Sequence, residues 1–423
     1  MATSPRNGRL ALLLLTVALL VGAATASAQP AAVTACENCH RDQRDTRLAT
    51  PAHDFAGSDV HRDRGFTCVD CHGGNPNEPD KVKAKAPATG FKGKPAGQQV
   101  IAVCSRCHSD GALMRKFAPK QRIDQAAEYA TSVHGQRLAK GDTNVATCIS
   151  CHGAHGVRLV TDAKAPVYVL NVATTCSRCH SDGERMKSYK LPDGSPLPTD
   201  QRAKYERSVH HAAMVKRNDL SAPTCNDCHG NHGAAPPGVG AIANVCGTCH
   251  TVFATKFALS RHSQIFDRSC VECHSNHEIA QPTDALLGTD KAALCVTCHD
   301  DGDNGLKAAA AMRGEIEKLK AAIGHSQELL AAAENAGMEM GDQQLALREA
   351  GNQLTLARTE MHAFDPKPVN DVLLAGLAIT AKVDADGEEA LHEVSYRRTG
   401  LAVSLGAILL VVIALRLKIR SLG

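Results

Sequence analysis

Tryptophan is absent from this chain of 423 residues, and aromatic residues together make up only 3% of it. Large aromatic side chains usually supply much of a buried core, so something else must fill the interior here. An excess of one charge is also missing, because 47 basic and 44 acidic residues leave a formal net charge of +3. Nucleic acid is therefore not an expected partner. With 22% charged and 43% hydrophobic residues, the chain is not expected to be disordered as a whole.

Cysteine, in contrast, occurs 18 times, and every cysteine belongs to the pattern C-x-x-C-H. Two thiols three positions apart lie on one face of a helical turn, where each can add to a vinyl group of one porphyrin. The adjacent imidazole then lies below the iron as its proximal ligand, and this pattern is the attachment signature of haem c. The attachment thiols are Cys36, Cys39, Cys68, Cys71, Cys104, Cys107, Cys148, Cys151, Cys176, Cys179, Cys225, Cys228, Cys246, Cys249, Cys270, Cys273, Cys295 and Cys298, and the proximal ligands are His40, His72, His108, His152, His180, His229, His250, His274 and His299.

Zinc ribbons and disulfides also use paired cysteines, but neither requires a histidine after each pair. With these motifs the sequence resembles the multihaem c-type cytochromes from Cys36 to His299, in particular membrane-anchored periplasmic electron-transfer proteins. The resemblance implies nine covalently bound haem c groups in residues 29–302, stacked in place of the missing aromatic core. The expected fold class is mainly α with much irregular coil, and haem attachment is expected to precede folding.

Internal repetition predicts the second axial ligand of most haems. The stretch Tyr-x-x-Ser-Val-His ends at His134 and His210, and shorter forms end at His61 and His262, each before a pair of motifs. Each of these leading histidines and the two motifs after it form one block, and the motif at Cys36 stands alone before the four blocks. A trailing histidine follows the motif histidine by three positions at His155, His232 and His277, whereas the first block has Asn75 there. This C-H-x-x-H arrangement looks like that of multihaem cytochromes in which the trailing histidine binds a neighbouring haem.

Two further distal ligands are needed if every iron has two histidines. His53 lies between the first two motifs, and His362 lies at the end of a predicted helix, so these two complete the set. Met114 and Met186 occupy equivalent places after two motifs and are the rival ligands, although a methionine packed on a haem edge would recur equally. The other histidines outside the motifs, His211, His325 and His392, are interpreted as solvated or packing residues.

After the last motif the composition becomes alanine-rich and charged. The spacing of Met312, Ile316, Leu319 and Ile323 predicts an amphipathic helix, and residues 303–366 are expected to form a helical hairpin. Residues 367–398 are expected to form a membrane-proximal helix that begins near Asn370, after Pro366 and Pro368 stop the hairpin. A simple stalk or a coiled coil that forms a homodimer are alternatives, and a similarity to the multihaem nitrite and hydroxylamine enzymes rests on helix order alone.

Both ends of the chain carry apolar runs. Residues 1–28 fit a cleaved signal peptide, with Arg6 and Arg9 before the apolar run and Ala26-Ser27-Ala28 at its end, although an uncleaved anchor is the alternative. Residues 399–417 are predicted to span a membrane and contact lipid, leaving residues 418–423 as a cytoplasmic tail. The bulk of the chain is then exported and periplasmic.

Irons with two histidine ligands have no open coordination site, so only electrons pass. The leading prediction is an electron carrier that connects a quinol-oxidising membrane complex, or other redox proteins, with periplasmic or outer-membrane acceptors. An alternative is an oxidoreductase with one five-coordinate haem that acts on a small nitrogen or sulfur compound. A docking role for the helical hairpin is compatible with electron transfer. No catalytic residue is predicted.

Overall fold

The computed structural model describes residues 32–238 and 241–422, and it is mainly helical, as the sequence predicts. The predicted signal peptide lies outside the described residues. The only β-type pairing within the described ranges is one isolated antiparallel bridge between Lys190 and Pro196. The described chain divides into two compact units, the first made by residues 32–203 and 210–236 and the second by residues 204–209, 237–238 and 241–422.

The first unit is a series of short helices joined by irregular segments. Its α-helices are α2 (Ala35–Arg41), α3 (Thr46–Ser58), α4 (Cys68–His72), α5 (Lys81–Ala84), α6 (Gln98–His108), α7 (Gly111–Phe117), α8 (Gln125–Thr131), α9 (Val133–Ala139), α10 (Cys148–His152), α11 (Val172–His180), α12 (Gly183–Met186) and α15 (Cys225–His229). Helices α13 (Gln201–Glu206) and α14 (Val209–Lys216) contain the chain positions at which the units change. The 3₁₀ turns are η1 (Arg62–Arg64), η2 (Pro87–Thr89) and η3 (Val169–Asn171).

Local capping explains why a motif of five residues forms a helix by itself. Helix α4 begins after Thr67, which forms a capping box with Asp70, and it ends at Gly73. Gly73 has a φ of +68°, and a Cβ atom there would meet the carbonyl oxygen of Gly90 at 2.0 Å. Only glycine fits this close approach without strain. Helices α10 and α15 begin and end in the same way, so the first motif of each of the first three blocks is a capped single turn.

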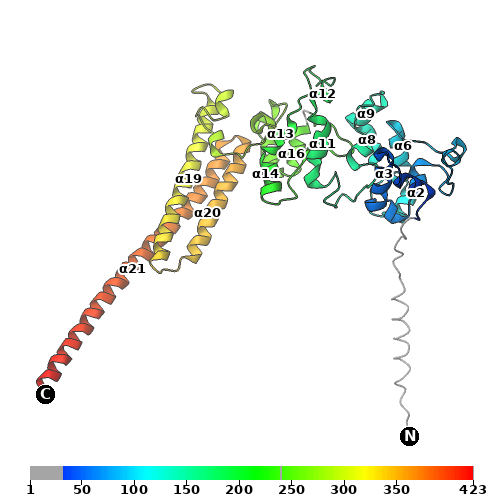
Figure 1. Ribbon diagram of the computed structural model, residues 1–423. Helices are drawn as coiled ribbons and strands as arrows, with labels where there is room; N and C mark the ends of the chain where they lie inside the picture. Colours follow the sequence, from blue (N-terminus) through cyan, green and yellow to red (C-terminus); the bar gives the residue numbers. More distant parts are fainter. Residues whose placement is uncertain (1–31, 239–240, 423) are drawn as a thin grey trace, which may run out of the picture. The chain divides into compact units, whose positions relative to one another are not determined.

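The second unit contains the last three motifs and a bundle of three long helices. Its elements are α16 (Ile242–Gly247), α17 (Thr251–Ala258), η5 (Arg261–Gln264), α18 (Val271–His274), η6 (Asp284–Leu286), η7 (Cys295–Thr297), α19 (Asn304–Asn335), α20 (Gly341–Glu360), η8 (Met361–Ala363) and α21 (Pro366–Leu422). Figure 1 shows α19 and α20 side by side, with α21 running along both and continuing past them. The expected hairpin therefore shares its core with a third helix.

The bundle core is aliphatic. Ile316 and Leu319 of α19 are fully buried, as their helical spacing predicts, and they pack with Leu373 of α21. Helix α21 begins at Pro366, four residues earlier than expected from the sequence. Proline is favourable in the first turn of a helix, where its missing N–H would have no partner, so Pro366 starts this helix, whereas α20 has already ended at Glu360.

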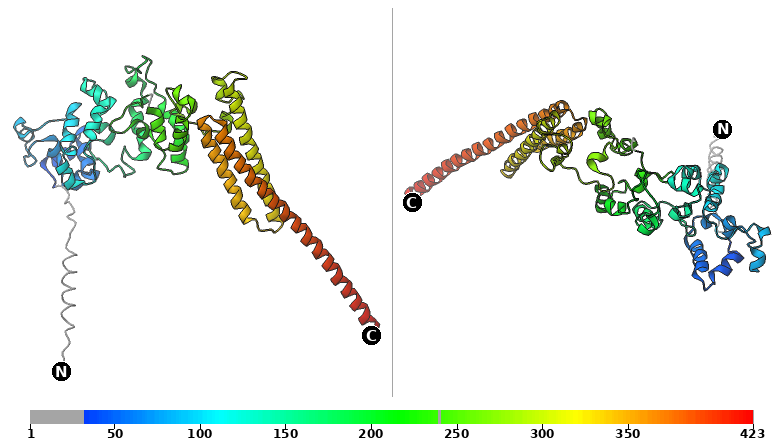
Figure 2. Two further views of the ribbon diagram at one scale, coloured as in Figure 1. Left: turned by 180° about the vertical axis from the view of Figure 1, so that it is seen from behind. Right: turned by 90° about the horizontal axis from the view of Figure 1, so that it is seen from above.

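Beyond the bundle, α21 continues as an exposed apolar helix (Figure 2). Val394 is its last buried residue, and the side chains from 395 to 422 are exposed. One 18-residue window of this helix has a mean hydropathy of 2.4, and none of the window is buried. By length and composition the C-terminal part of α21 is therefore able to cross a membrane.

Candidate haem-binding sites

In the first two blocks the motif residues are positioned by two kinds of helix. The first motif forms a capped single turn, in α4 and α10, whereas the second motif ends a longer helix, in α6 and α11. The 18 thiols are all free in the structure, and none is fully buried. Each pair is therefore available for thioether attachment, which requires unpaired thiols.

Thiols of successive motifs approach each other. Cys104 donates a hydrogen bond to Cys148 and lowers the pKa of Cys148 to about 7, and Cys176 does the same to Cys225. Within the second unit, Cys246 and Cys270 make the equivalent contact. Porphyrins attached at such thiols would be close neighbours.

Each of six proximal histidines faces a histidine that lies outside the motifs. The ring centroids are 6.1 Å apart for His61 and His108, 5.9 Å for His72 and His155, 6.1 Å for His134 and His180, 6.1 Å for His152 and His232, 6.0 Å for His262 and His299, and 6.2 Å for His274 and His362. All six non-motif histidines in these pairs are among the distal ligands expected from the sequence.

These distances fit an iron ion between the rings. A metal–imidazole bond of about 2.0 Å, and a ring centroid about 1.1 Å behind the bonded nitrogen, put the two centroids about 6 Å apart. Ordinary aromatic pairs spread over about 4.5–7 Å, so the distance in one pair would mean little. Six motif histidines with the same spacing from a non-motif histidine are what a row of haems with two axial histidines requires.

The pairs follow one regular order along the chain, which we call the register. A leading histidine, such as His61 or His134, faces the second motif of its own block. A trailing histidine faces the first motif of the preceding block, as His155 faces His72 and His232 faces His152. His362 takes the trailing role for the last block.

The ring planes differ between the two classes of pair. In the three pairs with a trailing-type histidine the planes lie within 8°, 11° and 20° of parallel. In the three pairs with a leading histidine the angles are 87°, 60° and 81°. The register therefore also sorts the sites by the relative orientation of their axial rings.

A recurring backbone hydrogen bond supports this register. The residue before a leading histidine donates its N–H to the carbonyl two residues beyond a trailing one: Val60 to Val157 at 2.9 Å, Val133 to Ala234 at 3.1 Å and Val209 to Ile279 at 2.9 Å. The hydrogen bond next to the paired histidines is thus repeated beside His210 and His277. Their role as distal ligands, and the partners of His229 and His250, remain sequence predictions.

Several imidazoles are oriented by a hydrogen bond from Nδ1 to a neighbouring oxygen atom, which leaves Nε2 for a metal. Asp59 accepts from Nδ1 of His61 at 2.9 Å, and Asp303 accepts from Nδ1 of His299 at 2.8 Å. The carbonyl oxygen of Gly93 accepts from His72 at 2.8 Å, and that of Arg358 accepts from His362 at 3.1 Å. Such partners fix the tautomer and raise the basicity of a metal-bound imidazole.

Asp59 is 1% exposed and serves three donors. Besides the His61 ring, its carboxylate accepts from the backbone N–H of His61 at 2.9 Å and of Val157 at 2.9 Å. Burial by itself raises the pKa of Asp59, but the hydrogen bonds from His61 and Val157 outweigh it and the pKa is lowered overall. The carboxylate is therefore charged at neutral pH and joins two blocks of the first unit.

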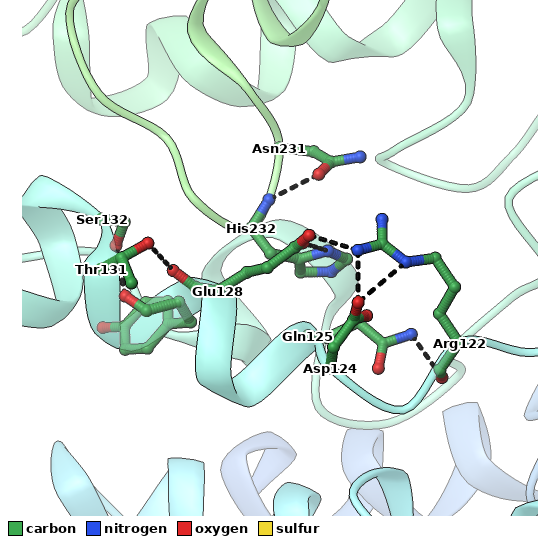
Figure 3. Close-up of polar contacts among 9 residues, drawn as sticks. Arg122, Asp124, Gln125, Glu128, Thr131, Ser132, Asn231 and His232 are labelled. Carbon is green, nitrogen blue, oxygen red and sulfur yellow. Dashed lines mark hydrogen bonds and ion pairs between the residues drawn. The ribbon is translucent and has the colours of Figure 1, made fainter.

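Figure 3 shows a similar arrangement around His232. A carboxylate oxygen of Glu128 lies 3.7 Å from Nδ1 of His232, and Arg122 bonds both Glu128 and Asp124. The backbone N–H of His232 donates to Asn231 at 2.7 Å. Burial lowers the pKa of His232 more than the charge of Glu128 raises it.

Burial also lowers the pKa of other paired imidazoles, including His108, His134, His155 and His180. A neutral imidazole has a lone pair for a metal, whereas an imidazolium has none. The protein surroundings therefore favour the form that binds iron.

Sequence reasoning missed the buried residue two positions before each leading histidine. Asp59, Ser132, Ser208 and Ser260 occupy this place and are between 0% and 2% exposed. Ser132 and Ser260 accept backbone N–H groups at the start of the segment that carries the histidine. A small polar residue at the same offset in all four blocks was the available signal.

The first motif is different. His53, one of the expected distal ligands, is exposed, and its Nε2 lies 3.2 Å from the carbonyl oxygen of Arg41. Among residues 32–238, no ring contact joins His40 to another imidazole.

Met114 and Met186 are both 7% exposed, which fits packing residues.

Comparisons with known proteins agree with the cofactor class. Residues 262–304, which contain the last two motifs, match a family model described as a doubled CXXCH motif. A comparison with curated proteins and a comparison with solved structures gave no match. The doubled motif indicates covalent haem c and an electron-transfer cytochrome of the multihaem kind.

Proposed function

We propose that this protein carries nine haem c groups and relays electrons between a quinol-oxidising membrane partner and periplasmic or outer-membrane acceptors. The observation that carries the proposal is the set of six imidazole pairs at 5.9–6.2 Å. An iron held between two imidazoles has no free position for a substrate, so electrons alone enter and leave.

The proposed haem ligands are the nine motif histidines and, opposite eight of them, the leading and trailing histidines together with His362. Residues 29–302 form the proposed haem-binding part. Asp303 connects this part to the helical bundle through hydrogen bonds. This residue accepts from His299 and, at 2.7 Å, from the first turn of α19. His362, which follows α20, faces His274 of the eighth motif and so connects the bundle to a second haem site. The bundle therefore holds the last two haems in addition to leading toward the membrane.

The C-terminal part of α21 supports a membrane location. Residues 399–417 would cross the bilayer, with Arg397 and Arg398 on one side and Arg416 and Lys418 on the other. An exported chain anchored in this way would keep its haems close to the membrane in which quinols are oxidised. Residues 418–423 would then be cytoplasmic.

The competing function is an oxidoreductase with one open iron. The first motif is a candidate place for it, because no ring contact joins His40 to another imidazole among residues 32–238. Purified protein distinguishes the two functions: the relay requires nine haems by mass spectrometry and alkaline pyridine spectra, low-spin ferric iron throughout, and no carbon monoxide binding after reduction. Substoichiometric high-spin iron that binds carbon monoxide would favour the enzyme.

Donor and location need a separate experiment. Membranes that contain the full chain should reduce its haems on addition of a quinol together with the donor complex, whereas a chain that ends at residue 398 should appear in the soluble periplasmic fraction. The truncated chain keeps all motifs and the bundle, so its haem content is the matched control. Membrane retention of the truncated chain would contradict the proposed anchor.

A further inference from the structure

The register predicts where the distal ligand of the first haem would be expected. Trailing histidines reach back to the preceding motif group, as His155 does to His72 and His232 does to His152. The haem at Cys36 precedes the first block, so its ligand should come from the trailing position of that block. That position is Asn75.

Asn75 is committed to local hydrogen bonds. Its side-chain oxygen accepts from the N–H of Asn77 at 3.1 Å. Its own N–H donates to the carbonyl oxygen of Ala84 at 2.9 Å, which closes the segment that contains α5. The next residue after Ala84 is Lys85, so the loop that replaces a trailing histidine ends in an amine.

Lys85 faces the proximal histidine of the first haem. Its Nζ lies 3.5 Å from Nε2 of His40, the imidazole nitrogen that would bind the iron. Two metal–nitrogen bonds of about 2.0 Å each would set such atoms about 4 Å apart. The observed gap of 3.5 Å lies between the 2.9–3.0 Å typical of an N–H hydrogen bond and the metal-bridged separation, so a shift of about 0.5 Å in the exposed lysine side chain would reach the latter. Nζ also lies 5.6 Å from the ring centroid of Phe91.

His53 is oriented differently. Its Nε2 faces the carbonyl oxygen of Arg41, so the nitrogen that binds iron at the other sites is engaged elsewhere. In the six imidazole pairs, by contrast, a distal ring faces its motif partner, and two of these rings, those of His61 and His362, hydrogen-bond an acceptor through Nδ1.

We infer that Lys85 is the distal ligand of the haem attached at Cys36 and Cys39, opposite His40. This inference rests on the proposed function, because it requires a haem at that motif. As a ligand, the ammonium group of Lys85 would release one proton to solvent so that its nitrogen lone pair could bind iron, and no electron would be transferred. The first haem is then the one site with an amine ligand in an array otherwise held by imidazoles.

The test is a pair of substitutions with matched controls in the full-length haem-loaded protein. Lys85→Ala should convert one haem from low-spin to high-spin and allow binding of one carbon monoxide per reduced protein. Lys85→His should restore a low-spin iron. Lys83→Ala removes an exposed lysine of the same short helix, and it should leave the spectra unchanged. In the parent protein, near-infrared magnetic circular dichroism should contain one imidazole–amine component.

The outcomes separate this inference from the proposed function. If Lys85→Ala leaves every haem low-spin, or if His53→Ala produces the high-spin haem in its place, Lys85 is not the ligand. Either result leaves an intact count of nine haems and does not affect the relay. Absence of haem at Cys36 in the parent protein would instead contradict the proposed function itself.

Discussion

The imidazole rings of His72 and His155 lie 5.9 Å apart with their planes 8° from parallel, although the two residues belong to different blocks. His61 and His108 have nearly the same separation but an interplanar angle of 87°. Parallel imidazoles donate into the same iron d orbital and split the two π-type orbitals strongly, whereas perpendicular ones leave them nearly degenerate. The two kinds of site are therefore expected to differ in their spectra.

Electron paramagnetic resonance of the ferric protein should resolve these two classes. The three trailing-type sites should give rhombic low-spin signals, and sites such as His61/His108 should give the broad signal with one large g value. His155→Met should remove one rhombic component and raise the reduction potential of that haem, because methionine–histidine ligation raises potential. His392→Ala, which changes an exposed histidine of α21, should alter neither signal. Loss of a large-g component in His155→Met would contradict the register.

Asp59→Asn should raise the reduction potential of the haem between His61 and His108. The buried carboxylate makes the His61 imidazole more electron-rich and so favours the ferric state, and the amide lacks that charge. The expected shift is on the order of tens of millivolts, measured by spectroelectrochemistry. Asp63→Asn changes an exposed carboxylate on the adjacent turn and should have a much smaller effect. Equal shifts in the two variants would mean that only long-range charge matters.

Asp284 should make the stability of the bundle depend on acid pH. Its carboxylate is bonded by Arg358 at 2.8 Å and lies 3.1 Å from Nζ of Lys320. The hydrogen bond from Arg358, more than that from Lys320, lowers the pKa of Asp284 despite partial burial. A pKa below the unfolded value of about 3.9 means that the stabilisation is complete above that pH and is lost as the pH falls through the folded pKa.

Asp284→Asn should therefore lower the free energy of unfolding by about 1–2 kcal/mol at pH 7. The difference from the parent should shrink as the pH falls below about 4, because the parent carboxylate is then protonated. Urea unfolding followed by helical circular dichroism at both pH values measures it. Glu339→Gln, which alters an exposed carboxylate between α19 and α20, is the control. A difference that does not depend on pH would exclude the charge of Asp284 as its cause.

Gly376 should be required for the packing of α21 on α19. A Cβ atom at this position would meet Cδ2 of Leu319 at 2.7 Å and Cβ of Gln353 at 3.3 Å. Because Leu319 is fully buried and has little room to move, Gly376→Ala should destabilise the bundle by about 1–3 kcal/mol.

Gly351→Ala supplies the contrast in the same thermal or urea unfolding experiment. Its Cβ atom would meet nothing within 4 Å, so the better helix propensity of alanine should stabilise α20 by up to about 1 kcal/mol. Equal effects of the two substitutions would show that helix propensity, and not contact with Leu319, decides the result.

The amino-acid sequence alone determines the haem-attachment motifs and most of the helical architecture. A C-x-x-C-H motif preceded by threonine and followed by glycine, as at Thr67 and Gly73, is a local unit whose thiols, imidazole and caps lie within one turn. The same holds for the helix of Met312 and Ile316 and for the apolar end of α21, since periodicity and hydropathy are also local properties. For these features neighbouring residues contain the whole signal.

Only the tertiary structure decided which side chains face each other across a haem-sized gap. The positions of the histidines in the sequence predicted a set of distal ligands, but the pairing of His155 with His72 depends on how two blocks pack. The approach of Lys85 to His40 and of Asp59 to Val157 depends on loops closed by backbone hydrogen bonds. An axial ligand is defined by a distance and a direction in space, and residues far apart in a chain acquire both only when the chain has folded.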